Sequence, residues 1–191
     1  LCLTGLLGVT ITGDAFNIFV FLEISSLSTY VLVALGAQRD RRALTASYTY
    51  LVMGTIGATF YVIGLGLLYQ ATGTLNLADL AVRLEPLGDL TSVRAGFAFI
   101  TVGLALKLAM FPIHAWLPNA YTYAPSVVSI FLAATSTKVA VYVMLRFIFT
   151  VFGYEFPVVE LSLETVFLPL ALIAMFVASA VAVFQTDFKR L

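Results

Sequence analysis

The sequence predicts an all-α protein, a bundle of transmembrane helices. Of its 191 residues, 61% are hydrophobic and 10% are charged, whereas a soluble domain carries about 25% charged residues. The apolar residues form long runs separated by short polar stretches, and about 20 apolar residues in a helix cross the hydrocarbon core of a bilayer. These observations indicate a multi-pass protein that is embedded in lipid.

Six apolar segments follow one another along the chain, and we expect each to be helical. Their approximate bounds are 1–12, 15–37, 44–70, 95–113, 127–149 and 163–184. The first is too short to span a membrane alone and is expected to be the end of a longer helix. The chain opens inside this apolar run without a methionine, so we expect an internal fragment of a longer protein. Residues 1–191 are expected to form a single transmembrane domain.

The connections between the segments differ in kind. Residues 38–42 form a short charged turn, whereas the apolar residues within 71–93 predict a short interfacial helix. Residues 112–125 hold three prolines, and residues 153–162 are expected to form a short acidic loop.

The prolines of residues 112–125 predict a broken helix near Lys107. Pro112 and Pro118 each remove a backbone hydrogen-bond donor. We therefore expect non-helical backbone between Lys107 and Trp116. Broken helices occur within membranes where the backbone is buried in protein or lines a cavity.

The distribution of Lys and Arg predicts the orientation of the protein. Successive helices alternate in direction, so the 38–42 turn and the end of the last segment share one side. That side carries Arg39, Arg41, Arg42, Lys189 and Arg190, and the other side carries Arg83, Arg94 and Arg146. Because basic residues are enriched on the cytoplasmic side, we expect the turn in the cytoplasm and the protein in the cell inner (plasma) membrane.

Several classes of function have no support in the composition. A net charge of zero gives no reason to expect nucleic-acid binding, and one cysteine, Cys2, excludes a disulfide within the chain. The single histidine, His114, excludes a bis-histidine haem from this chain alone. Zinc binding also lacks enough His and Cys ligands. We therefore expect no metal and no cofactor.

Three ionisable residues lie well inside apolar segments: Glu23, Lys107 and Lys138. Each costs roughly 2.5–3.5 kcal/mol at the centre of a membrane helix by insertion scales, and such residues usually serve transport. A buried lysine suits proton transfer because a carboxylate that moves nearer or further changes its hold on a proton. We expect Glu23 and Lys107 to lie on facing helices within reach of each other. A purely structural ion pair is the alternative, but it leaves one lysine without a partner.

Polar residues near these charges are candidates for the same pathway. His114 lies between the two lysine-bearing segments, so it is a candidate relay; the alternative is an ordinary hydrogen-bonded histidine. Hydroxyl residues can hold water but also bond the preceding helical turn, which is the ordinary interpretation. These hydroxyl residues are Ser25, Ser26, Ser28, Thr29, Thr135, Ser136 and Thr137.

Trp116 and the glycines of the third segment have ordinary structural explanations. Trp116 is expected to be an interfacial anchor. The glycines predict close helix packing; they are Gly54, Gly57, Gly64 and Gly66.

Residues 107–129, KLAMFPIHAWLPNAYTYAPSVVS, resemble the signature of antiporter-like membrane subunits. Such subunits occur in Mrp-type Na+/H+ antiporters, respiratory complex I and membrane-bound hydrogenases. By this resemblance, Glu23 in FVFLEISSLSTYVLV matches the family's helix glutamate, and Lys107 matches the lysine on its broken helix. Lys138 matches the next pathway lysine, and HAWLP places His114 at the family's histidine. The matches span essentially the whole chain.

The resemblance implies an inverted-repeat transporter fold of about fourteen helices, of which this chain covers the first repeat and the beginning of the segment after it. It also implies a proton pathway through Glu23, Lys107, His114 and Lys138. In one place the chain departs from the pattern. Several complex I members have a second histidine after WLP, where this chain reads AYTYAP with Tyr121. This puts a two-histidine relay in doubt and, with GDAFNIFVFLE, favours the D-type subunit of Mrp antiporters.

Three hypotheses for the function remain open. The first is a proton-conducting subunit of a multi-subunit Na+/H+ antiporter, with other membrane subunits as partners and with no chemistry or cofactor of its own. The second is a proton-pumping subunit of NADH:quinone oxidoreductase or a membrane-bound hydrogenase, and hence part of a redox-driven translocase. The third is a membrane scaffold that transports nothing.

Overall fold

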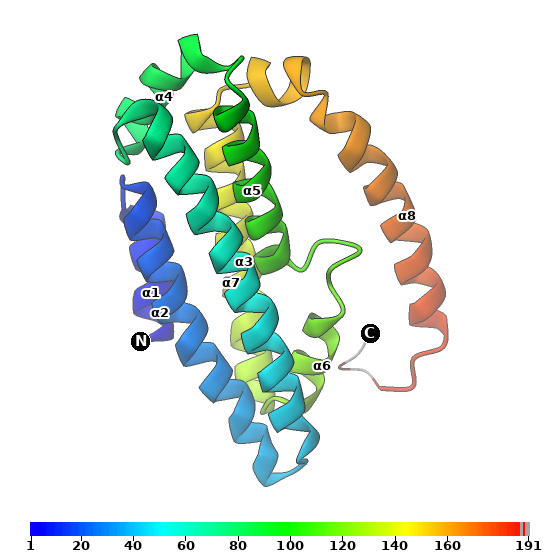
Figure 1. Ribbon diagram of the computed structural model, residues 1–191. Helices are drawn as coiled ribbons and strands as arrows, with labels where there is room; N and C mark the ends of the chain where they lie inside the picture. Colours follow the sequence, from blue (N-terminus) through cyan, green and yellow to red (C-terminus); the bar gives the residue numbers. More distant parts are fainter. Residues whose placement is uncertain (188, 190–191) are drawn as a thin grey trace.

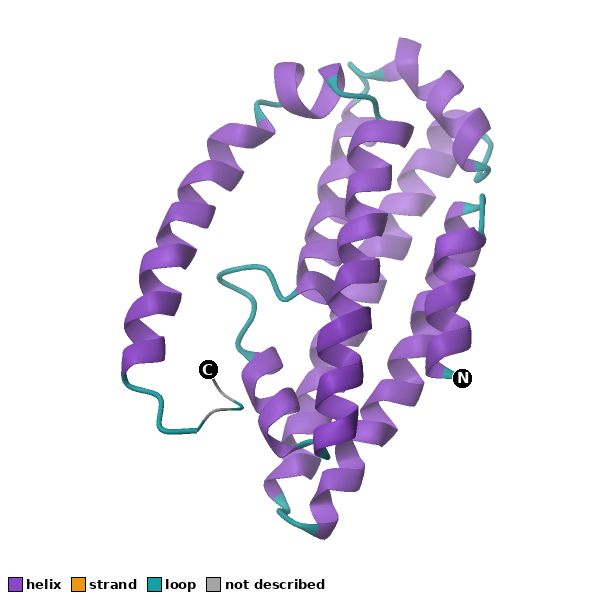
Figure 2. Ribbon diagram, turned by 180° about the vertical axis from the view of Figure 1, so that it is seen from behind, coloured by secondary structure: helices purple, strands orange, loops and turns teal. Residues whose placement is uncertain are grey.

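Helices form nearly all of the computed structural model, which describes residues 1–187 and 189 (Figure 1, Figure 2). Arg190, one of the basic residues that predict the orientation, lies outside the described residues. The α-helices are α1 (Cys2–Ile11), α2 (Ala15–Ala34), α3 (Arg42–Thr72), α4 (Leu77–Leu84), α5 (Thr91–Leu108), α6 (Trp116–Tyr123), α7 (Ser126–Leu145) and α8 (Leu163–Val183). The shorter helical pieces are 3-10 turns at Leu35–Gln38 and Glu85–Leu87 and π-helical pieces at Arg146–Val151 and Glu155–Glu160. The predicted all-α fold is confirmed.

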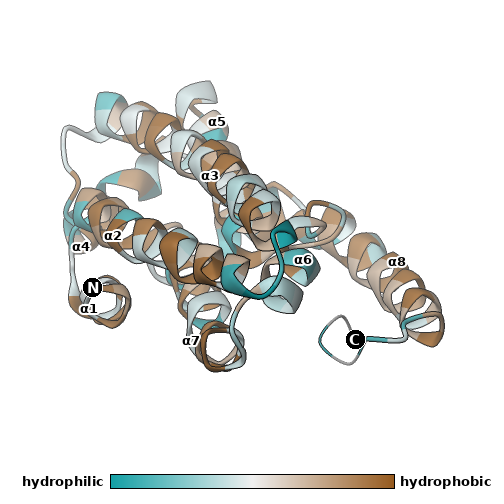
Figure 3. Ribbon diagram, turned by 90° about the horizontal axis from the view of Figure 1, so that it is seen from below, coloured by the Kyte–Doolittle hydropathy of each residue, from teal (hydrophilic) through white to brown (hydrophobic). Residues whose placement is uncertain are grey.

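Five of these helices are long and apolar enough to cross a membrane. They are Ala15–Gln38, Arg42–Thr72, Thr91–Leu108, Ser126–Val151 and Leu163–Val183, and α1 is a shorter apolar helix. Figure 3 shows hydrophobic residues along these helices and hydrophilic ones at the turn between α2 and α3. The described chain is therefore a bundle of membrane-spanning helices. Only α8 stands apart from it, without a buried residue (Figure 1).

The short interfacial helix predicted within 71–93 is α4. Asn76 begins it, because its side-chain oxygen accepts hydrogen bonds from the N–H groups of Ala78 and Asp79 at 3.0 and 3.3 Å. Arg83 forms an ion pair with Asp79 at 2.9 Å, one turn away, and thereby lowers the pKa of the Asp79 carboxyl. Leucines on the opposite face are buried in the core: Leu77, Leu80 and Leu84.

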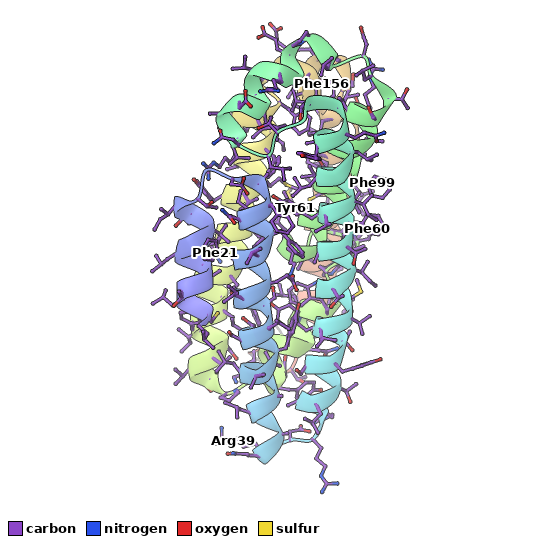
Figure 4. All side chains as sticks on the ribbon, turned by 60° about the vertical axis from the view of Figure 1, so that its left-hand side comes forward. Phe21, Arg39, Phe60, Tyr61, Phe99 and Phe156 are labelled. Carbon is purple, nitrogen blue, oxygen red and sulfur yellow. The ribbon has the colours of Figure 1, made fainter. Side chains whose placement is uncertain are left out.

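The basic 38–42 turn and the end of the described chain lie on the same side of the bundle. Arg42 lies over the ring of Tyr123 at 4.8 Å. The next residue, Ala124, accepts a hydrogen bond from Lys189 Nζ at 2.9 Å. Figure 4 shows Arg39 at the end of the bundle opposite to Phe156. The helix directions are as predicted, and the cytoplasmic location of this end stays a prediction.

One stretch expected as a loop is helical instead. Within 153–162, residues Glu155–Glu160 form a π-helical piece. The reason is tertiary: Phe156 is buried and packs edge-on against Phe97, with ring centroids 5.7 Å apart. An apolar anchor of this kind orders a segment that its charges alone marked as exposed.

Glycines bring α3 and α5 into close contact. A Cβ atom added to Gly103 would lie 2.6 Å from the carbonyl oxygen of Gly57, and one added to Gly64 would lie 2.7 Å from that of Gly96. Backbones that approach this closely leave no room for a side chain. The packing role predicted for Gly57 and Gly64 is confirmed. The prediction is wrong for Gly66, which faces open space.

Replacing Gly103 with alanine is therefore expected to destabilise the α3–α5 contact by about 1–3 kcal/mol through overpacking. Gly66→Ala is the matched control, because nothing lies within 4 Å of its added Cβ. Since alanine favours helix over glycine, this control is expected to be neutral or slightly stabilising. Thermal denaturation of the two purified variants would compare them. Equal denaturation temperatures would contradict the assigned contact.

Candidate functional site

An ion pair between α2 and α5 forms the centre of the site. Lys107 Nζ lies 2.8 Å from Glu23 Oε1 and 2.8 Å from Ser26 Oγ. The side chains of Lys107 and Glu23 are 9% and 23% exposed. The predicted contact between these two residues is confirmed. An ammonium group that donates to a carboxylate and a hydroxyl at once is compensated, which lowers the cost of holding it in a membrane.

One face of α2 supplies the partners of Lys107. Ser26 and Tyr30 follow Glu23 by three and seven residues, and this spacing places all three on one side of a helix. Ser26 and Tyr30 are 7% and 4% exposed. The helical period would have identified Tyr30 as a neighbour of the site, but the sequence reasoning missed it.

The helix that carries Lys107 ends directly after it. Ala109 adopts the left-handed conformation with a φ of 54°, and α6 begins only at Trp116. Pro112 lies within the non-helical backbone, after a cis peptide bond. The predicted interruption is confirmed, and α5 ends before the expected bound of residue 113. Because the C-terminal end of a helix carries a partial negative charge, it favours the ammonium group in its last turn.

Trp116 ties the two sides of the break together. Its Nε1 donates a hydrogen bond to the carbonyl oxygen of Leu106 at 3.2 Å. Its ring stacks on Tyr50 of α3 at 4.3 Å, and Tyr50 meets Tyr30 edge-on at 4.7 Å. Trp116 is 4% exposed, so the interpretation as an interfacial anchor is wrong. Hydropathy could not reveal this, since indole rings suit both a membrane interface and an aromatic core.

Three of the seven hydroxyl groups near the charges have the ordinary role. Ser28, Thr29 and Thr135 donate to carbonyl oxygens of the preceding helical turn at 2.7–2.8 Å. Ser26 instead contacts Lys107 on another helix, and Thr137 lies 3.5 Å from Lys138 Nζ on its own helix. Among the described contacts, Ser26 is thus the hydroxyl group that joins the central ion pair.

His114 and Lys138 lie outside the central ion pair, and among the described contacts neither forms a hydrogen bond or ion pair with Glu23 or Lys107. His114 is partly buried in the non-helical backbone, and its Nδ1 has no hydrogen-bond partner among the described residues. Lys138 Nζ donates to the carbonyl oxygen of Ala133 and lies 3.5 Å from Thr137 Oγ1.

The expectation that Lys138 is buried is wrong for the described chain, where it is exposed on α7. An apolar segment predicts surroundings of lipid or protein without distinguishing them. Within the described residues, no group of three or more His, Cys, Asp and Glu side chains could hold a metal ion.

Comparisons with known proteins place the chain among membrane subunits. A profile of the family described as "NADH:quinone oxidoreductase/Mrp antiporter, TM" matches residues 12–191. The chain is 51% identical over 147 residues to the N subunit of NADH-quinone oxidoreductase from Desulforudis audaxviator, covering 77% of the chain and 29% of the relative. It is 33% identical over 189 residues to the D subunit of the Na(+)/H(+) antiporter from Alkalihalophilus pseudofirmus, covering 99% of the chain and 37% of the relative.

A solved structure gives the same result for the fold. The membrane-bound sulfane sulfur reductase, an archaeal respiratory membrane complex, contains a chain that matches with a TM-score of 0.86 and 36% sequence identity. The match covers 99% of this chain and 38% of that one. The chain thus spans about a third of the length of the curated relatives it matches.

Proposed function

The chain belongs to the NADH:quinone oxidoreductase/Mrp antiporter family, and from this premise we propose that it conducts protons as part of a multi-subunit monovalent cation/proton antiporter. The observation that supports this most is the contact of Lys107 with Glu23 and Ser26 at the end of a broken helix. A titratable cation in a bilayer, held by a movable carboxylate, is suited to taking up and releasing a proton.

The mechanism depends on the distance between Glu23 and Lys107. At about 4 Å, a unit charge contributes about 4 kcal/mol where the effective dielectric constant is about 20. Since a tenfold change in an equilibrium corresponds to about 1.4 kcal/mol, this is roughly a thousandfold in proton affinity. Lys107 keeps its proton while Glu23 is near and gives it up when the two groups move apart. The end of α5 is the natural place for such a movement, because Lys107 lies in the last helical turn before the non-helical backbone.

The proton released by Lys107 passes to Lys138 in this proposal. His114 is a suitable intermediate in this transfer, because it lies in the link between α5 and α6. In addition, its Nδ1 has no hydrogen-bond partner among the described residues. A neutral imidazole accepts a proton on one nitrogen and donates from the other. Glu23, Lys107, His114 and Lys138 together form the proposed pathway.

The relatives suggest the partners and the coupled ion. The D subunit of a Na(+)/H(+) antiporter is, by its name, one subunit of a larger assembly, so we propose other membrane subunits as partners and Na+ as the exchanged cation. The second candidate is a proton-pumping subunit of an NADH:quinone oxidoreductase. The 51% identity to an N subunit favours it. Purifying the complex from its native membranes would distinguish the two, because only the second contains redox subunits.

Replacing Lys138 with alanine tests conduction against scaffolding. In the full-length protein within its complex, we expect Lys138→Ala to lower proton transport by at least about tenfold, since the receiving amine is lost. Transport is measured in membrane vesicles as cation-driven collapse of a pH gradient, or as redox-driven pumping if redox subunits are present. Arg41→Ala is the control, because Arg41 is exposed in the turn before α3. Normal transport by an assembled Lys138→Ala complex would support the scaffold instead.

A further inference from the structure

Three buried polar atoms have no hydrogen-bond partner among the described residues: the Tyr30 hydroxyl oxygen, His114 Nδ1 and Ser136 Oγ. A buried polar group without a partner costs about 1–3 kcal/mol and calls for an explanation. Tyr30 lies beyond Ser26 on α2, and Ser136 lies two residues before Lys138 on α7. Unpartnered groups therefore occur near both lysines of the proposed pathway.

The first half of a connection between the lysines begins at Ser26. Its hydroxyl accepts a hydrogen bond from Lys107 Nζ at 2.8 Å. The Tyr30 hydroxyl lies one helical turn further along α2, near Ser26, and has no hydrogen-bond partner among the described residues. Tyr30 is 4% exposed, so its hydroxyl has no ready access to bulk water.

The second half runs from Tyr30 to α7. Tyr50 contacts the ring of Tyr30 edge-on, with ring centroids 4.7 Å apart. Tyr121 packs against the buried cluster that contains both rings, and its hydroxyl lies near the side chain of Thr137. The Thr137 hydroxyl in turn lies 3.5 Å from Lys138 Nζ. We call Tyr30, Tyr50 and Tyr121 the tyrosine bridge, because they lie between groups that contact the two lysines.

We propose that the tyrosine bridge carries the proton between Lys107 and Lys138. This inference rests on the proposed function and adds to His114 a second route between the two lysines. Each hydroxyl accepts a proton on its oxygen and passes its own proton to the next group. The Lys107 ammonium becomes an amine, the Lys138 amine becomes an ammonium, and every hydroxyl is restored.

Neutral hydroxyls suit this position for two reasons. They cost far less than charges to bury in a membrane, and each both donates and accepts. Internal water molecules bound at Tyr30 and Ser136 would satisfy their unpartnered oxygens and close the remaining gaps, since buried water typically bonds several such groups. Tyr121 also stands at the point in AYTYAP where this chain departs from the pattern of the antiporter-like subunits.

Phenylalanine substitutions test the bridge, because they remove a hydroxyl and keep the ring. In the full-length protein within its complex, Tyr30→Phe and Tyr121→Phe are each expected to lower proton transport in vesicles by about tenfold or more. Tyr121→His is expected to recover at least half of the activity, because imidazole also relays a proton. The matched control is Tyr61→Phe on α3, whose hydroxyl donates to the Ala15 carbonyl oxygen at 3.0 Å.

The outcomes separate the bridge from the underlying proposal. Normal transport by both Tyr30→Phe and Tyr121→Phe overturns the bridge, and so does a Tyr121→His variant as inactive as Tyr121→Phe. An equal loss in Tyr61→Phe also overturns it, because any buried tyrosine would then behave alike. If Lys107→Ala abolishes transport while these variants conduct, only the bridge fails. If Lys107→Ala conducts normally, the proposed function itself fails.

Discussion

Proton transport is expected to collapse when Lys107 is replaced by alanine, although the complex still assembles. The substitution removes the titratable group that contacts Glu23 and Ser26. Lys107→Arg is expected to fail as well, by at least about a hundredfold. Arginine keeps the charge but does not deprotonate in proteins, so it cannot release a proton. Transport is measured in membrane vesicles, and subunit content is compared by purification.

The arginine variant separates proton transfer from a structural ion pair. A guanidinium group binds a carboxylate well, so a purely structural pair between positions 23 and 107 predicts near-normal behaviour for Lys107→Arg. Alanine lowers function under both interpretations and cannot separate them. Near-normal transport in Lys107→Arg would therefore remove Lys107 from the pathway.

The second large effect is expected for Glu23→Gln. Glutamine has nearly the same shape but no charge, so Lys107 keeps a hydrogen-bond acceptor and loses its counter-ion. Removing one partner of a buried ion pair costs about 3–5 kcal/mol, and Glu23 is 23% exposed, so we expect a smaller cost of about 2 kcal/mol. Transport is expected to fall between tenfold and a hundredfold. Glu23→Asp keeps the charge on a shorter side chain and should retain more activity than Glu23→Gln.

Glu164→Gln is the matched control for Glu23→Gln. Glu164 lies in the first turn of α8, is exposed, and forms no ion pair with Lys107 among the described contacts, so neutralising it removes the same charge outside the site. The two variants are compared in the same vesicle assay, with thermal denaturation of each purified complex. Wild-type transport by Glu23→Gln would show that Lys107 works without its carboxylate, against the proposed mechanism.

The sequence alone determined the features that depend on local composition. The number and approximate bounds of the spanning helices follow from apolar length, because only a run long enough to cross the bilayer can satisfy its backbone there. The interruption after Lys107 followed from prolines, which lack a donor wherever they stand. The prediction that Glu23, Lys107 and Lys138 are functional followed from the free-energy cost of placing a charge in lipid.

Only the tertiary structure decided which side chains meet. Glu23 and Lys107 are 84 residues apart, and their contact depends on how α2 and α5 rotate about their axes. The same rotations give Ser26, alone of its neighbouring hydroxyl residues, a contact with Lys107 among the described residues. The packing of α6 and α7 in turn places Trp116 inside the protein and leaves Lys138 exposed. In a membrane helix that is apolar all round, hydropathy does not mark the face that meets protein. Close packing between particular helices makes that choice, which is why the ion pair could be expected from sequence but its surroundings could not.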